Sequence, residues 1–310
     1  MALSLKTAIA TYGHTAALKD GSVKLSGIDL DFVEVAPIIA AFRRMVRALE
    51  FDVCEMAITT YLCARANGKE FTAIPVFPVR AWHHGATSYN TNAGISKPSD
   101  ITGKKVGVRA YTVTTGVWAR GILASEYGVD WDKTTLVIAD EEHVAEYKAP
   151  SNVVKAPEGA NLADMVVSGE LAAGIGLGKI DSPDVKPLIP NAQDAAAEWN
   201  KKTGIYPINH MIVIKNSVLR DNPGVADELY NAFKAAKESF ISKLNSGAEL
   251  SPEEQTLANS RAIVGADPVP YGVEANRKAL EAIIKFAADQ KIISGSVSPE
   301  EIFVPSTVKN

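Results

Sequence analysis

The strongest constraint on the fold is an alternation of helix and strand patterns between residues 42 and 80. A helix leads into a short apolar strand, Phe51–Val53, then a polar turn, Cys54–Thr60, opens a second helix, and the apolar strand Phe71–Val79 follows. Short apolar strands separated by helices are typical of α/β sheets, whose ligands bind at the carboxyl ends of the strands. The polar residues that we expect at those ends, suited to holding a small anion, are Glu55, Thr59, Thr60 and Arg80.

The alternation continues beyond residue 87 and predicts two lobes. Two segments look like crossings between lobes, one after Arg80 and one through residues 205–213. We therefore expect an α/β fold with a discontinuous first lobe, residues 1–86 and 211–310, and an inserted second lobe, residues 87–210. Two crossings form a hinge, which places the ligand in the cleft between the lobes.

Composition narrows the functional class. The chain has 310 residues, of which 46% are hydrophobic and 22% are charged, as in ordinary soluble globular proteins. A net charge of -4 gives no reason to expect nucleic-acid binding. The two cysteines, Cys54 and Cys63, match neither a disulfide framework nor a zinc motif, and buried free thiols are predicted.

The distribution of apolar residues along the chain also argues against a membrane protein. The first residues lack a secretion signal, and no segment approaches the roughly 20 apolar residues of a membrane span. If Met1 is the native start, the expected location is the cytoplasm. The long helices predicted near the C-terminus could pack on their own lobe or on a neighbouring subunit, so a homo-oligomer is possible.

Four segments carry a family resemblance: FRRMVRALEFDVCEMAITTYLCARANGKEFTAIPVFPVRAWHH, VGVRAYTVTTGVWARGILASEYGVD, GIYPINHMIVIKNSVL and DPVPYGVEANRKALEAIIKFAADQKIISGSVSPEEIFVPST. They resemble 4,5-dihydroxyphthalate decarboxylases and their relatives, which implies a type 2 periplasmic-binding-protein fold. Two departures fall where the ligand is expected. His14 stands in the first loop where the family commonly has an arginine, and Trp82-His83-His84 replaces an Arg-His pattern.

The resemblance implies decarboxylation of a hydroxylated aromatic acid without a cofactor. A phenolic oxygen supplies electrons to the ring, an acid protonates the ring carbon, and an arginine clamps a second carboxylate. Arg80 is the first candidate for this clamp, and the alternative is a structural ion pair with Glu55 or Asp52. Tyr111 and Trp82 are candidates for stacking on the aromatic ring.

Threonines before the helix that begins near residue 117 predict an anion site in the second lobe. Hydroxyls and free backbone N–H groups at a helix N-terminus attract anions, although Thr114 or Thr115 could equally be an ordinary cap. Thr112 belongs to the same turn. Thr59 and Thr60 are the counterpart in the first lobe, with the same two interpretations.

Four histidines lie at predicted loop or hinge positions: His14, His83, His84 and His210. Imidazole suits general acid–base chemistry near neutral pH. His84 and His210 lie in the two crossings and are the preferred candidates, with His14 and Glu55 as further candidates. Adjacent residues His83 and His84 face opposite ways in an extended segment and match no metal motif, so no metal is predicted.

Two other functions use the same fold. The first is a non-catalytic binding protein for a small carboxylate. The second is pyrimidine synthesis of the thiamine type, which would require a cysteine-rich motif that this chain lacks. The expected ligand in the preferred interpretation is a small aromatic or dicarboxylic acid.

Overall fold

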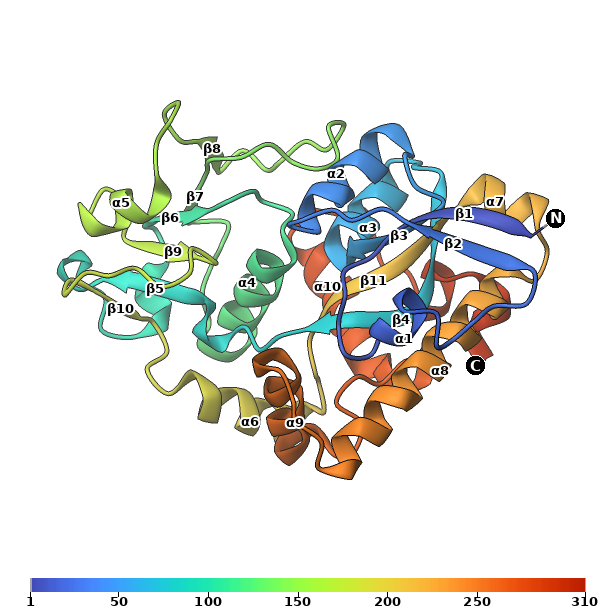
Figure 1. The fold of residues 1–310 in the computed structure, drawn as a ribbon. Coiled ribbons are helices and arrows are strands. Elements are labelled where there is room, and N and C mark those ends of the chain that lie inside the picture. The colour runs from blue at the N-terminus through green and yellow to red at the C-terminus, as the bar shows by residue number, and fades with distance from the viewer. Residues whose placement is uncertain (1, 310) are drawn as a thin grey trace.

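The computed structural model describes residues 2–309 and contains two β-sheets, each covered by helices (Figure 1). The first sheet has the strand order β2-β1-β3-β11-β4. Its strands are β1 (Leu3–Ala8), β2 (Ile28–Phe32), β3 (Val53–Ala57), β4 (Phe71–Arg80) and β11 (Ile208–Lys215). Strand β1 runs parallel to β2 and β3, whereas β11 runs antiparallel to both of its neighbours. The sheet thus combines strands from both ends of the chain.

The second sheet has the order β10-β5-β9-β6-β7-β8. Its strands are β5 (Thr87–Asn90), β6 (Lys105–Val108), β7 (Thr135–Ile138), β8 (Val153–Lys155), β9 (Ala173–Ile175) and β10 (Val185–Pro187). Strands β6 to β9 pair in parallel, and β5 is antiparallel to β9 and β10. Apart from residues 208–210 at the start of β11, each sheet takes its strands from one of the two predicted lobes, while the lobe boundaries themselves stay a prediction.

Ten α-helices are described: α1 (Ala16–Lys19), α2 (Ile39–Ala48), α3 (Ile58–Ala66), α4 (Thr114–Tyr127), α5 (Leu162–Val167), α6 (Ala192–Thr203), α7 (Asn216–Asp221), α8 (Val225–Ser246), α9 (Pro252–Val264) and α10 (Arg277–Asp289). Short 3-10 helices are η1 (His84–Ala86), η2 (Thr91–Ala93), η3 (Pro98–Ile101), η4 (Glu274–Asn276), η5 (Pro299–Ile302) and η6 (Pro305–Lys309). No helix within residues 2–309 is long and apolar enough to cross a membrane.

One predicted boundary is wrong. The polar turn expected at Cys54–Thr60 is instead the buried strand β3, which continues to Ala57, and α3 follows at Ile58 without a loop. The strand persists because β3 pairs with β1 on one side and with β11 on the other, so its backbone groups are satisfied. Glu55 therefore lies inside a central strand rather than on a turn.

Two other differences are smaller. The chain between residues 140 and 160, expected to be loop, contains the short strand β8. Helix α7, which follows β11 directly, was not predicted.

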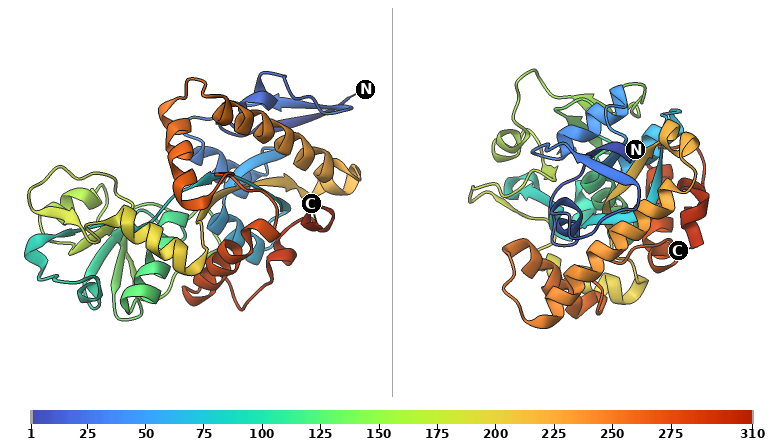
Figure 2. Two further views of the ribbon diagram at one scale, coloured as in Figure 1. Left: turned by 90° about the horizontal axis from the view of Figure 1, so that it is seen from below. Right: turned by 45° about the vertical axis from the view of Figure 1, so that its right-hand side comes forward.

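The two sheets are joined by a buried contact between α4 and α10 (Figure 2). The ring of Trp118 in α4 packs edge-on against Phe286 in α10, and its indole N–H donates to the carbonyl of Ile208 at 2.9 Å. Gly121 is required at the closest approach, because a Cβ atom there would overlap the Phe286 ring. The relative position of the sheets is thus fixed by tight packing as well as by the crossings.

Candidate functional site

A buried carboxylate–imidazole pair lies where β3 and β11 run side by side. Glu55 is fully buried, and its carboxylate accepts hydrogen bonds from the Ala10 backbone N–H at 3.0 Å and the Tyr12 hydroxyl at 2.8 Å. The ring Nδ1 of His210 lies 2.6 Å from Glu55 Oε1. Burial alone would raise the pKa of Glu55, but His210 and the two donors outweigh it and lower the pKa. Glu55 is therefore an anion at neutral pH.

His210 keeps one ring nitrogen available. Because Nδ1 faces Glu55, the pair fixes the ring orientation, and Nε2 has no hydrogen-bond partner within residues 2–309. The side chain is 19% exposed, and the Phe42 ring packs edge-on against it with centroids 5.0 Å apart. A carboxylate behind one imidazole nitrogen and a free second nitrogen form a standard general acid–base arrangement.

The other histidines named from the sequence are placed differently. His14 Nε2 donates to the Pro78 carbonyl at 3.0 Å, and His83 Nε2 lies 3.0 Å from the Asn209 amide oxygen. Burial lowers the pKa of both to about 4, so both are neutral at physiological pH. His84 packs edge-on against Trp199 of α6, and burial lowers its pKa too. Of the four histidines, His210 is the one that has a carboxylate on one ring nitrogen within residues 2–309.

Arg80 does not form the ion pair with Glu55 or Asp52 that was the structural alternative to a carboxylate clamp. Its guanidinium donates to the carbonyls of Tyr206 and Pro270, at 2.9 Å and 2.8 Å, and to the Asn276 side chain. Its Nη1 and Nη2 atoms serve the return crossing and the segment before α10, while its buried Nε has no partner within residues 2–309. Arg80 holds the hinge together, and the carboxylate-clamp prediction has no support in these contacts. Trp82 likewise packs on Tyr206, with ring centroids 4.9 Å apart.

The threonines predicted to bind an anion instead join the lobes. The Thr59 hydroxyl, in the first turn of α3, donates to the Thr112 carbonyl at 2.6 Å and lies 2.7 Å from the Thr114 hydroxyl at the start of α4. Thr60 approaches His143 at 3.4 Å. Thr115 is half-buried beside Gly176 and has no hydrogen bond within residues 2–309, so its hydroxyl is the one left for a ligand.

A cavity that the sequence did not reveal lies between α2 and the second lobe. Its volume is about 440 Å³, and it is lined by Ile39, Ala40, Arg43, Arg44, Arg47, Arg109, Asp140 and His143. Arg43 and Arg109 both pair with Asp140, at 3.2 Å and 2.8 Å. Three arginines spaced three or four apart on one helix, and a histidine in a polar segment, are typical of a solvated surface, but His143 is buried. The available signal was the complementary acidic run Asp140-Glu141-Glu142.

Phe42 links this cavity to the carboxylate–imidazole pair. Its ring lies edge-on to His210 at 5.0 Å and to His143 at 6.2 Å between centroids. Burial, followed by the nearby charges of Arg109 and Arg43, lowers the pKa of His143 to about 4. Phe42 therefore packs against His210 of the pair and against His143, which lines the cationic cavity.

Tyr111 and Thr112 already have partners inside the protein. The Tyr111 hydroxyl donates to the Gln290 carbonyl at 2.8 Å, and its ring stacks on Tyr147. Thr112 donates both its N–H and its hydroxyl to the carboxylate of Glu142. The predicted anion site thus holds a carboxylate, and that carboxylate belongs to the chain itself.

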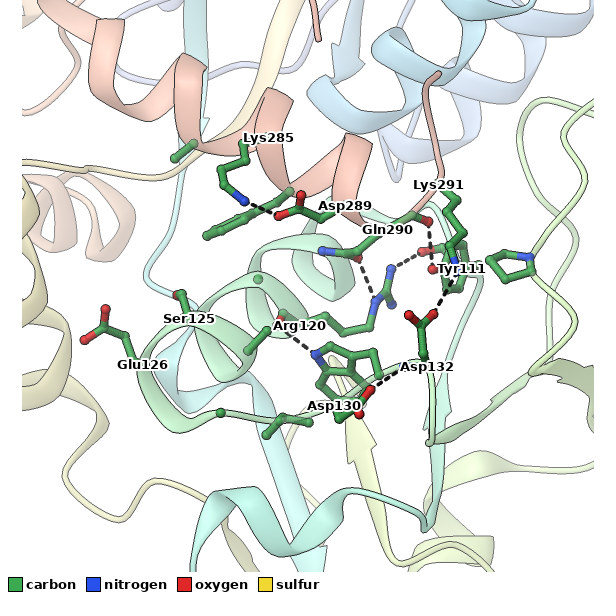
Figure 3. A pocket seen from close by; sticks show the side chains of 18 of the residues that line it. Tyr111, Arg120, Ser125, Glu126, Asp130, Asp132, Lys285, Asp289, Gln290 and Lys291 are labelled. Atoms are coloured by element: carbon green, nitrogen blue, oxygen red, sulfur yellow. Dashed lines mark hydrogen bonds and ion pairs between the residues drawn. The ribbon is translucent and has the colours of Figure 1, made fainter. Parts of the chain in front are cut away.

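A larger cavity, of about 720 Å³, lies between α4 and α10 (Figure 3). It is lined by aromatic rings such as Trp131 and Phe286 and has ion pairs at its rim, including Lys285–Asp289. None of its lining residues belongs to the Glu55–His210 pair. Across residues 2–309 no group of three or more His, Cys, Asp and Glu side chains is arranged to hold a metal ion, and both cysteines are free and buried.

Comparison with known structures identifies the class of fold. No family model matches the chain. The periplasmic aliphatic sulphonate binding protein SsuA from Escherichia coli aligns with a TM-score of 0.54 and 12% identity, over 98% of this chain and 92% of that one. The two-lobed α/β architecture expected from the sequence is confirmed as a periplasmic-binding-protein fold.

Sequence relatives define the family more narrowly. The 4,5-dihydroxyphthalate decarboxylase of Comamonas testosteroni is 29% identical over 325 aligned positions, which cover 99% of this chain and 98% of that protein. The 4,5-dihydroxyphthalate decarboxylase of Pseudomonas putida is 32% identical over 210 positions, 64% of this chain and 81% of that protein. The chain belongs to the 4,5-dihydroxyphthalate decarboxylase family.

Proposed function

We propose that this protein is a carboxy-lyase that removes one carboxylate from a hydroxylated phthalate, with His210 as the proton donor. The observation that carries the proposal is the Glu55–His210 pair, in which a buried carboxylate holds Nδ1 at 2.6 Å and Nε2 remains free. The relatives named as 4,5-dihydroxyphthalate decarboxylases support the same substrate class.

The proposed reaction is a protonation of the ring followed by loss of carbon dioxide. A phenolic oxygen para to the departing carboxylate pushes an electron pair into the ring, and the carbon that bears the carboxylate takes a proton from His210 Nε2. The bond to the carboxylate then breaks, its electron pair restores the aromatic ring, and carbon dioxide leaves. Solvent returns a proton to the imidazole. Because the ring itself stores the electrons, this sequence needs no organic cofactor.

Each neighbouring group has a role in this scheme. Glu55 holds the His210 ring by Nδ1 and leaves Nε2 for the substrate, and a positioned acid of this kind contributes about 10²–10⁴-fold to rate. The second carboxylate of the substrate binds toward the cationic cavity, where Arg43, Arg47 and Arg109 supply the positive charge. Thr115, with its free hydroxyl, is the threonine proposed to contact substrate.

The test is turnover of 4,5-dihydroxyphthalate by the purified protein in the presence of a chelator, with the product followed by chromatography. His210→Asn keeps a hydrogen-bonding partner for Glu55 but cannot donate a proton in this way, so kcat is expected to fall by about 10²–10⁴-fold. His84→Asn is the matched control, because His84 contacts α6, and it is expected to retain near-normal kcat.

Two outcomes contradict the proposal. If the wild-type protein binds phthalate but forms no product, it is a carboxylate-binding protein rather than an enzyme. If His210→Asn retains the wild-type kcat, another group donates the proton.

A further inference from the structure

The turn between β6 and α4 donates hydrogen bonds to both carboxylate oxygens of Glu142. The backbone N–H of Tyr111 donates to Glu142 Oε1, and the N–H and hydroxyl of Thr112 donate to Glu142 Oε2, the former at 3.1 Å. This cradle, defined by those three donors, lies at the carboxyl end of a strand and just before the N-terminus of a helix of 14 residues. Donors arranged in this way fit any planar carboxylate.

A buried positive charge lies directly behind the cradle. Arg120 of α4 is fully buried, and its guanidinium donates to the Tyr111 carbonyl at 2.7 Å and to the Gln290 side chain at 2.8 Å (Figure 3). Its Cζ atom lies 4.3 Å from the centre of the Tyr111 ring. Within residues 2–309, Nη1 has no partner and no carboxylate pairs with this side chain.

The buried guanidinium keeps one donor, Nη1, without a partner, although two hydrogen bonds, the Tyr111 ring and the nearby Glu142 carboxylate offset part of its charge. Removing a charge from water costs several kcal/mol, and proteins rarely accept that cost without a partner. Here the side chain reaches back toward the first turn of α4, and Nη1 lies 3.1 Å from the position that a Cβ atom of Gly116 would occupy. Its charge therefore adds to the positive end of the helix at the cradle. Both features favour an anion in the cradle.

Glu142, which occupies the cradle, belongs to the acidic run Asp140-Glu141-Glu142, and the other two carboxylates of this run pair with arginines that line the cationic cavity. Asp140 pairs with Arg43 and Arg109, and the next residue, Glu141, pairs with Arg47 at 3.1 Å. Of these three consecutive carboxylates, the first two pair with arginines of the cationic cavity and the third accepts the hydrogen bonds of the cradle. A phthalate-type ligand carries two carboxylates and would meet the same groups.

We propose that the cradle is a carboxylate subsite of the cleft, for which Glu142 and one carboxylate of an aromatic diacid compete. The nature of the diacid rests on the proposed function. Arg120 strengthens the subsite from behind, and Gln290 holds Arg120 by accepting from its Nε while donating to the Val117 carbonyl at 2.9 Å. A ligand that enters has to displace Glu142, so the chain's own carboxylate lowers the apparent affinity.

The experiment measures binding of phthalate by calorimetry, because phthalate lacks the hydroxyl needed for turnover. Glu142→Gln removes the competing charge, and we expect phthalate to bind about tenfold tighter than to wild type, in line with one charge-assisted contact. Glu141→Gln is the matched control. It removes the same negative charge from the neighbouring position and releases Arg47 rather than the cradle, so the effect specific to the cradle is the amount by which the affinity of Glu142→Gln exceeds that of Glu141→Gln.

A second variant tests the cradle itself. Thr112→Val in the Glu142→Gln background removes one donor and is expected to return the affinity toward the wild-type value, with circular dichroism confirming that each variant is folded. The proposal is overturned if Glu142→Gln binds phthalate no more tightly than Glu141→Gln, or if no variant binds phthalate. Turnover by the wild-type protein separates the two proposals. If Glu142→Gln binds phthalate more tightly but the wild-type protein has no turnover, the subsite is supported and the enzymatic function is not. If the wild-type protein has turnover but Glu142→Gln and Glu141→Gln bind phthalate equally, the enzymatic function is supported and the subsite is not.

Discussion

Three buried histidines predict a loss of stability in mild acid. His14, His83 and His143 are nearly inaccessible to solvent, and burial lowers the pKa of each from 6.5 to about 4. For His143, the positive charges of Arg109 and Arg43 act in the same direction. For His14, the opposing effects of the Pro78 carbonyl and Glu55 are smaller than that of burial. The folded protein therefore keeps these rings neutral over a pH range in which an unfolded chain protonates them.

The sign and size follow from proton linkage. Because the folded pKa is depressed, the stabilisation is fully present above the unfolded pKa and is lost as pH falls toward the folded pKa. At about pH 5 the unfolded form of each ring binds nearly one proton more than the folded form, which costs about 2 kcal/mol per histidine. Three rings together cost about 6 kcal/mol, a large part of a typical unfolding free energy of about 5–15 kcal/mol.

The assay is urea unfolding at a series of pH values between about pH 7.5 and about pH 5, followed by tryptophan fluorescence. His83→Gln keeps a side-chain amide near Asn209 and removes one titrating ring, so the acid-induced loss is expected to shrink by about a third. An unfolding free energy that changes by less than about 1 kcal/mol over this range would refute the reasoning.

Two substitutions test how the lobes are joined. Thr59→Val removes the hydroxyl that bonds Thr112 and Thr114, and thermal melts are expected to show an unfolding free energy lower by about 1–3 kcal/mol. Thr60→Val loses only a weaker contact at 3.4 Å and serves as the control. Equal melting temperatures of the two variants would contradict the assignment. Gly121→Ala places a methyl group against the Phe286 ring and is expected to lower the unfolding free energy by about 1–3 kcal/mol. Adding Phe286→Leu is expected to restore part of this loss. An unchanged melting temperature for Gly121→Ala alone would show that α4 and α10 are not closely packed.

The local pattern of apolar residues was sufficient to predict most helices and strands but not the points where one element ends and the next begins. The spacing of apolar residues predicts helices over 38–49, 117–127 and 273–290. They match α2, α4 and α10 to within a few residues, and the start of the last one is partly the 3-10 helix η4. The same reasoning placed a turn at Cys54 because it could not foresee that β11, far along the chain, would pair with β3 and extend it. Pairing partners of that kind are set by the assembled sheet, not by the neighbours in sequence.

The candidate site shows the same division. Its residue types, an acid, histidines, threonines and arginines at strand ends and crossings, were predictable. Glu55 and His210 were both candidates from the sequence, but their pairing was not foreseen. The roles of the arginines were not separable, because a buried arginine and a ligand-binding arginine have the same appearance in sequence. Arg80 turned out to hold backbone carbonyls, while Arg43, Arg47 and Arg109 line the cleft.

The sequence by itself determined the α/β class, the two-lobed plan and the family, because these depend on periodicity, composition and matching segments. Tertiary structure decided which side chains meet. Glu55 and His210 are 155 residues apart and touch only because an antiparallel strand returns between β3 and β4. Glu142 meets the turn before α4 because it follows β7, the paired neighbour of the strand β6 that leads into this turn. Such contacts depend on the folded distance between side chains, which sequence separation does not determine.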